Sequence, residues 1–221
     1  MRNWGIVISV FYAIVCLGLL VPAGVFLSYE RFGSWHDFTG KVRGTYADSL
    51  FWILAGAILV SQALLLFLSV DTSQKRLKPR SHILVSVAMG SLLFALLSSA
   101  VIWSVGFAIR DNFWDRILEK DESIPLFWAA LWLVWSAVFY MYSRGSSEIV
   151  TRLVSWLLKG SVLELLIVVP CHVIVRRRHD CTAPVATSFG IVTGIAIMLL
   201  AFGPSVLFLY KKRLNEYAPH T

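Results

Sequence analysis

Long stretches without charge recur along this chain, and they constrain its fold more than any other feature. An α-helix rises about 1.5 Å per residue and the hydrocarbon core of a bilayer is about 30 Å thick, so about 20 mostly apolar residues cross it. Four stretches meet this requirement cleanly, a fifth is shorter but uncharged and rich in aromatic residues, and a sixth is long enough but contains Lys159 and Glu164. The six expected membrane-spanning ranges are residues 5–27, 49–70, 83–109, 124–142, 152–175 and 185–210.

Composition excludes most other classes of protein. Of the 221 residues, 57% are hydrophobic and only 15% are charged, whereas a soluble domain has about 25% charged residues. This excludes a soluble globular enzyme, a disordered chain and a coiled coil, and three cysteines are too few for a disulfide scaffold. The polar connections are too short to fold separately. We therefore expect an all-α fold, with residues 1–221 forming one polytopic membrane domain of about six transmembrane helices in one bundle.

The distribution of charge between the connections predicts the orientation. With six spans, one side holds both termini and ten Lys and Arg residues against nine on the other, but the acidic residues number three and nine. The net excess of +7 therefore falls on the side of the termini. Because basic loops favour the cytoplasm, we expect both termini to be cytoplasmic, in a bacterial-type inner membrane or a plasma membrane. Loop bias and attraction to anionic headgroups explain the basic charge, so no nucleic-acid partner is expected.

The fifth expected span is the most informative, because it carries ionisable side chains. Its first part, residues 147–159, is amphipathic, with Glu148, Arg152 and Lys159 on one helical face, which suits either the entry turn of a span or a helix in the headgroup layer. Glu164 is turned about 140° from Lys159 and is poorly placed to pair with it. A charged side chain inside a span costs about 2.5–3.5 kcal/mol on insertion scales. Glu164 is therefore expected to face the protein interior or water, as a buried neutral group or as a proton or cation site.

Two thiols and two imidazoles lie near the end of the same range, in Cys171, His172, His179 and Cys181. Such ligands suit zinc or copper, although the spacing matches no structural zinc motif. A disulfide between the two cysteines is an alternative if this end is extracytoplasmic. Unrelated structural residues are a third, and whether residues 152–175 span the membrane or re-enter it stays open.

Three adjacent arginines, Arg176, Arg177 and Arg178, directly follow this range. Cations are favoured at a helix C-terminus by the helix dipole, which requires no further function. A guanidinium group also matches phosphate oxygens, so the run predicts an anion or lipid-headgroup site. The acidic segment 111–122, expected on the same face, is an alternative partner.

Two further patterns indicate how the helices pack. Small residues four positions apart let helix backbones approach closely in a membrane. Aromatic side chains at positions i, i+4 and i+7 form one stripe, which suits packing or a wall for an apolar ligand. The residues concerned are Gly190 and Gly194, Ser86 and Gly90, and the stripe of Trp128, Trp132 and Trp135.

The chain contains no recognisable catalytic constellation, and no cofactor can be assigned from its sequence. The leading hypothesis is a non-catalytic structural or accessory subunit of a larger membrane assembly, with anionic lipids and either other membrane subunits or a second copy as partners. A small transporter or channel that uses Glu164 and the three arginines is the main alternative. A redox or metal-handling protein that uses the Cys and His residues is the third.

Overall fold

The computed structural model of the chain describes residues 2–29, 33–71, 80–109, 123–143, 149–178 and 183–217. All regular secondary structure in these ranges is helical, as the sequence predicts. The elements are α1 (Arg2–Val15), the π-helical turn η1 (Cys16–Leu20), α2 (Val21–Ser28), α3 (Trp35–Ala47), α4 (Ser49–Asp71), α5 (Arg80–Ile109), α6 (Ser123–Ser143), α7 (Ile149–Arg177) and α8 (Ala183–Tyr217).

Several of these helices are long and apolar enough to cross a membrane. Among the described residues, four meet this requirement: Ser9–Ser28, Leu84–Ile109, Ile124–Tyr142 and Arg152–Arg177. A fifth results if α3 and α4, bent by 70° from one another, are counted as one broken span. The described part of α8 adds a shorter apolar helix, Ala183–Leu199. These helices are compatible with a multi-pass membrane protein, whereas the expected number of six goes beyond what length and composition support.

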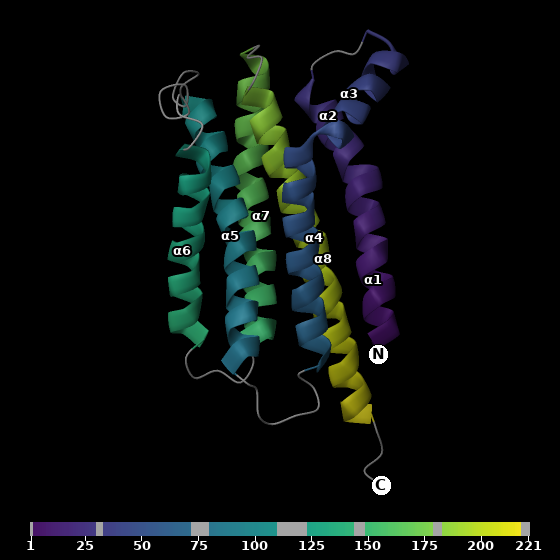
Figure 1. Cartoon of the computed structure of the whole chain (residues 1–221), viewed down its shortest axis with the longest axis vertical. Helices are drawn as coiled ribbons and strands as arrows, with labels where there is room; N and C mark the ends of the chain where they lie inside the picture. The colour runs from purple at the N-terminus through teal and green to yellow at the C-terminus, as the bar shows by residue number, and fades with distance from the viewer. Residues whose placement is uncertain are drawn as a thin grey trace.

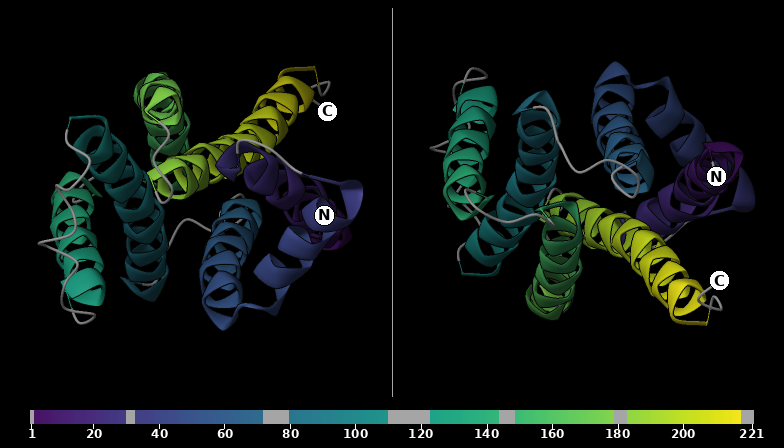
Figure 2. Two further views of the ribbon diagram at one scale, coloured as in Figure 1. Left: turned by 90° about the horizontal axis from the view of Figure 1, so that it is seen from above. Right: turned by 90° about the horizontal axis from the view of Figure 1, so that it is seen from below.

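Helices α5, α7 and α8 form the centre of the bundle, and each packs against the other two. Helix α6 packs against the outer side of α5, and α4 packs against another side of it. The first helix divides its contacts, because α1 packs against α4 while α2 packs against α8. Figure 1 shows the long helices side by side with the start of α1 and the end of α8 at the same end, and Figure 2 shows α5 between α6 on one side and α4, α7 and α8 on the other.

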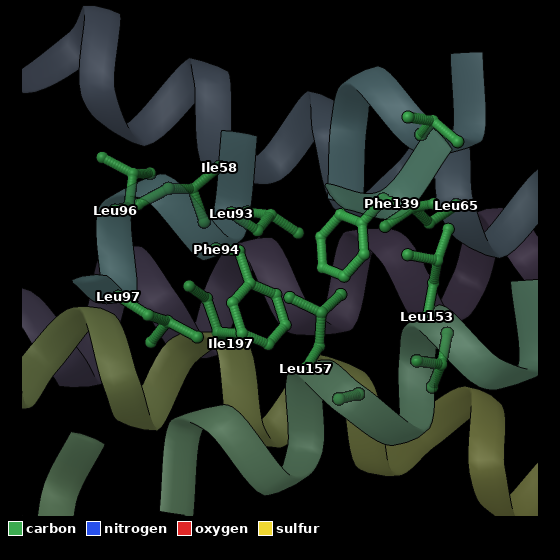
Figure 3. Packing of buried hydrophobic residues seen from close by; sticks show 13 residues of the cluster. Ile58, Leu65, Leu93, Phe94, Leu96, Leu97, Phe139, Leu153, Leu157 and Ile197 are labelled. Atoms are coloured by element: carbon green, nitrogen blue, oxygen red, sulfur yellow. The ribbon is translucent and has the colours of Figure 1, made fainter. Parts of the chain in front are cut away.

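The largest hydrophobic cluster joins five helices around Phe94 of α5 (Figure 3). The ring of Phe94 lies 4.7 Å from that of Trp135 and 5.1 Å from that of Phe139, both on α6. On its other side, Phe94 packs against Gly160 of α7, where an added Cβ would lie 2.9 Å from Cζ of Phe94. The absence of a side chain at Gly160 therefore allows α5 and α7 to approach closely.

Helix α3 lies in the segment between the first two expected spans, where the sequence predicts only a polar connection. It begins after Ser34, whose hydroxyl accepts a hydrogen bond from the backbone N–H of Asp37 at 3.2 Å, a typical N-cap. None of its residues is buried. The pattern of apolar residues that reveals a packed helix is therefore absent, and only the capping residues indicate this one.

The first helix is irregular at η1, which ends two residues before Pro22. In a π-helix a carbonyl accepts from the N–H five residues further on, and for Leu17 that residue is Pro22, which has no N–H. The hydroxyl of Tyr46 on α3 donates a hydrogen bond to the Leu17 carbonyl instead. A side chain of α3 thus satisfies the carbonyl that the π-turn and the proline leave without a backbone donor.

A buried carboxyl group between α7 and α8

Helix α7 is continuous from Ile149 to Arg177 and has two distinct faces. Arg152 and Lys159 lie on its exposed face, together with Trp156, which is 41% exposed. Glu164 lies on the opposite face, which is buried against α5 and α8. The amphipathic segment 147–159 is therefore continuous with the rest of α7 from Ile149 onward, while its first two residues lie outside the described ranges.

Glu164 is buried at the middle of α7. It is only 1% exposed, and at 1.5 Å per residue it lies about 22 Å from the first residue of the helix and about 20 Å from the last. Within the described part of the chain, no hydrogen-bond donor reaches either carboxyl oxygen, although both oxygens are buried. A buried polar group without a partner costs about 1–3 kcal/mol, so this position is costly for the fold.

Two glycines of α8 make room for the carboxyl group. A Cβ added at Gly194 would overlap Oε2 of Glu164 and lie 2.9 Å from its Cδ. A Cβ added at Gly190 would lie 3.5 Å from Oε1 and 3.1 Å from Cγ1 of Val168. The Glu164 carboxyl group therefore occupies the space that a side chain at position 194 would need. The space beside these two glycines, which their spacing in the sequence predicts as a helix-packing surface, is thus occupied by an ionisable side chain.

Two buried serines of α7 and α8 form hydrogen bonds with groups other than Glu164, and one of them, Ser188, also lies within hydrogen-bond distance of the Ser28 hydroxyl. Ser161, one turn earlier on α7, donates to the carbonyl of Leu158 at 2.9 Å. Ser188 of α8 donates to the carbonyl of Val185 at 2.8 Å. Neither hydroxyl is thus committed to the carboxyl group, which sits in a mostly apolar environment.

His172 lies two turns beyond Glu164 and is 5% exposed. Its Nδ1 lies 2.7 Å from Oγ1 of Thr187, and that hydroxyl lies 3.1 Å from the carbonyl oxygen of Ala183. If the single hydroxyl proton goes to Ala183, Nδ1 carries the imidazole proton and donates to Thr187. The other nitrogen, Nε2, then presents a lone pair that is buried and has no partner among the described residues.

A polar side chain that the sequence analysis overlooked, Gln62 of α4, is also buried without partners. It is 6% exposed, and within the described chain neither amide atom forms a hydrogen bond. It lines a cavity of about 20 Å³ together with Leu157 and Ile197 and other apolar side chains, which is room for one water molecule. Leu157 precedes Glu164 on α7, and Ile197 follows Gly194 on α8. Both therefore lie nearer than Glu164 and Gly194 to the end of the bundle where the termini are. The signal was a lone glutamine within an otherwise apolar range.

The proposed thiol and imidazole ligands are only partly described. Cys171 is buried beside His172 on α7, whereas His179 and Cys181 lie outside the described residues. Within the described ranges, no group of three or more His, Cys, Asp or Glu side chains is placed to hold a metal ion. Metal binding and the disulfide both stay predictions.

The first of the three arginines forms a hydrogen bond with the end of the first helix. Arg176 donates a hydrogen bond from Nη2 to the carbonyl oxygen of Tyr29 at 3.3 Å, at the C-terminal end of α2. Arg177 and Arg178 are exposed. The acidic segment 111–122, expected as a partner for this run, lies outside the described residues.

Two indoles of the tryptophan stripe on α6 bind α5. Trp132 donates to the carbonyl of Ala88 at 3.0 Å, and Trp135 donates to Oγ of Ser98 at 2.8 Å. Trp128 is half-buried, and among the described residues no acceptor reaches its Nε1. Packing thus engages two of the three indoles, and a ligand wall stays a prediction.

The small residues of α5 lie in its packed part. Ser86 is 2% exposed. A Cβ added at Gly90 would lie 3.2 Å from Cδ2 of Leu153 on α7. The absence of a side chain at Gly90 thus contributes, as at Gly160, to the close approach of α5 and α7.

Comparison with protein-family models, curated proteins and solved structures gives no match to this chain. The proposed function accordingly rests on the placement of side chains within the helical bundle.

Proposed function

We propose that this protein is a multi-pass membrane transporter with six helical passes and cytoplasmic termini, in which Glu164 takes up and releases a proton or a small cation. The observation that carries the proposal is the buried carboxyl group at the middle of α7, which has no partner among the described residues. Ionisable side chains inside membrane helices commonly belong to ion or proton pathways, because they are too costly to retain without a function.

A purely structural role explains Glu164 less well. A structural carboxyl group is expected to bond a neighbouring helix, since buried polar groups are otherwise destabilising. Instead, Glu164 is set against two glycines that offer no side-chain donor. A group that exchanges its proton or cation during a transport cycle has a reason to lack a permanent partner.

Polar groups on either side of Glu164 support a path for the exchanged ion. On the side of the termini lies the cavity beside Gln62. On the other side lies His172, eight residues and about 12 Å along α7, with a buried Nε2 that has no partner among the described residues. These separations exceed a hydrogen bond, so water molecules would have to connect the groups.

A structural or accessory subunit is the second candidate, and the position of α6 favours it. This helix packs mainly against α5, and Leu126, Leu133 and Val134 are exposed on its outer side. Another membrane subunit, or a second copy of the chain, would find an apolar surface there. Lipid acyl chains would cover the same surface, so this observation supports the candidate less strongly than Glu164 supports transport.

Reconstitution into liposomes with an entrapped pH-sensitive dye tests the transport proposal. A potassium gradient with valinomycin supplies an inward driving force for protons, and uptake of radioactive sodium is measured in parallel. We expect ion entry above the rate of empty liposomes for the parent protein, and a loss of at least about tenfold for Glu164→Gln, because the amide keeps the shape of a neutral carboxyl group but cannot release a proton.

Ser161→Ala is the matched control, because Ser161 is buried one turn from Glu164 and bonds within its own helix. Its ion flux should equal that of the parent. Equal flux in Glu164→Gln and the parent, or no flux of either cation through the parent, would refute the transport proposal.

A further inference from the structure

Basic side chains from two elements that are distant in sequence meet at Tyr29, at the end of the bundle opposite the termini. Arg176 of α7 donates to the backbone carbonyl of Tyr29 at 3.3 Å. Lys41 of α3 places its amine 4.8 Å from the centre of the Tyr29 ring, which is a cation–π contact. One residue therefore holds two cations, one through its backbone and one through its ring.

Both cations keep hydrogen-bonding capacity. A guanidinium group has five N–H donors and an ammonium group has three, and the contacts with Tyr29 use one N–H of Arg176 and the charge of Lys41 rather than its donors. Among the described residues, neither cation forms an ion pair. Arg177 and Arg178 add two exposed cations directly after Arg176. A cluster of this kind attracts an anion, and guanidinium groups fit phosphate oxygens in particular.

The residues around the cluster are typical of protein segments at the headgroup level of a membrane. Helix α3 is bent by 70° from α4 and has no buried residue, so it extends sideways at the end of the bundle. Trp35 at its start is 78% exposed. Trp52, at the start of α4, donates to the backbone carbonyl of Tyr46 at 2.8 Å. Tryptophan side chains favour the level of the headgroups, and Trp35 shares α3 with Lys41, so we expect this end of the bundle to lie at that level.

We infer that Tyr29, Lys41 and Arg176 form a binding site for the phosphate of an anionic phospholipid headgroup. Tyr29 positions the two cations, Arg176 presents its unused donors to the phosphate oxygens, and the tryptophans of α3 and α4 hold the site at the headgroup level. A free phosphate group has the same chemistry, but it lacks the acyl chains that would lie along the apolar outer sides of the helices. The sequence marks the three arginines as an anion site, but not Lys41 or Tyr29.

Thermal unfolding of the full chain in a neutral detergent, with added lipid, tests the site. Three additives are compared at equal concentration: phosphatidylglycerol, phosphatidylcholine and inorganic phosphate. We expect only phosphatidylglycerol to raise the unfolding temperature of the parent. In Lys41→Gln/Arg176→Gln, the phosphatidylglycerol concentration needed for half of the effect should rise roughly thirtyfold, since each basic residue near an anionic lipid contributes about a factor of five.

Arg43→Gln is the matched control, because Arg43 is an exposed cation on the same helix as Lys41. This variant removes one charge without touching Tyr29, so it should raise the required phosphatidylglycerol concentration by no more than about fivefold, well below the effect of the double variant. The inference is overturned if Arg43→Gln and the double variant weaken the lipid effect equally, or if phosphatidylcholine or inorganic phosphate stabilises the parent as well as phosphatidylglycerol does. Because each variant is compared with and without lipid, a lower basal stability does not obscure the result.

Discussion

Replacing Gly194 by alanine tests the geometry around Glu164 most directly. The new Cβ would overlap Oε2 of Glu164 and lie 3.1 Å from Cδ2 of Leu165. The carboxyl group has little room to move away, because Val168 and Ala100 close the neighbouring space at Gly190. Overpacking of this kind costs about 1–3 kcal/mol. Alanine is also a better helix former than glycine by about 1 kcal/mol, which offsets part of that cost.

A double-mutant cycle separates these two effects. In Glu164→Ala the carboxyl group is absent, so the alanine at position 194 should fit, and only its helix propensity should remain. Gly194→Ala is therefore expected to destabilise the parent and to leave Glu164→Ala unchanged or slightly more stable. The coupling free energy between the two positions should equal the steric cost, about 1–3 kcal/mol.

Unfolding in detergent, followed by tryptophan fluorescence at one fixed heating rate, measures the four proteins. For a chain of this length, 1 kcal/mol corresponds to about 2–4 °C in the unfolding temperature. Gly56→Ala is the control, because a Cβ there meets no atom within 4 Å, and it should not lower stability. An equal loss on Gly194→Ala in both backgrounds would show that Glu164 does not occupy this space.

Two other substitutions probe buried polar groups elsewhere in the bundle. Tyr46→Phe removes the hydroxyl that donates to the Leu17 carbonyl, and it should lower the free energy of unfolding by about 1–2 kcal/mol; unchanged stability in the same unfolding assay would mean that another donor serves this carbonyl. Gln62→Leu keeps a similar volume but removes two buried amide atoms that have no partner among the described residues and that water in the neighbouring cavity can satisfy; because the proposed ion path needs this water, the substitution should lower the free energy of unfolding by about 1–2 kcal/mol, and a gain of stability would indicate a dry cavity.

The helical class of the fold was predictable because backbone groups in an apolar environment must be satisfied within the chain. Long apolar ranges therefore indicate helices whatever their neighbours are. Helix α3 was missed for the opposite reason, since it buries no residue and its polar sequence resembles a connection. The Ser34 cap was the available signal. Such a cap indicates where a helix begins, but no apolar stripe follows this one to support the prediction.

The candidate site was only half predictable. Glu164 stands out because a carboxyl group in an apolar range is costly, and Gly190 and Gly194 stand out by their spacing. That these features meet one another depends on the rotation and the relative height of α7 and α8, which result from packing with α5 as well. Likewise, the hydrogen bond from Tyr46 to Leu17 joins residues 29 positions apart, and only the proline at position 22 indicated that a carbonyl nearby needs a donor.

The π-helical turn in the first helix rotates the side chains of the second half about the helix axis relative to those of the first half. A π-turn accommodates one residue more than an α-helical turn, and each residue of an α-helix rotates the following side chains by about 100°. The half before the turn contacts α4, whereas the half after it contacts α8, where Gly24 approaches Val192 closely and Ser28 bonds to Ser188. Without the extra residue, the face that carries Gly24 and Ser28 would be turned by about 100° from its orientation toward α8. A single additional residue thus gives one continuous helix two differently oriented contact surfaces. Packing against α8 therefore depends on the number of residues in this turn as much as on the side chains that follow it.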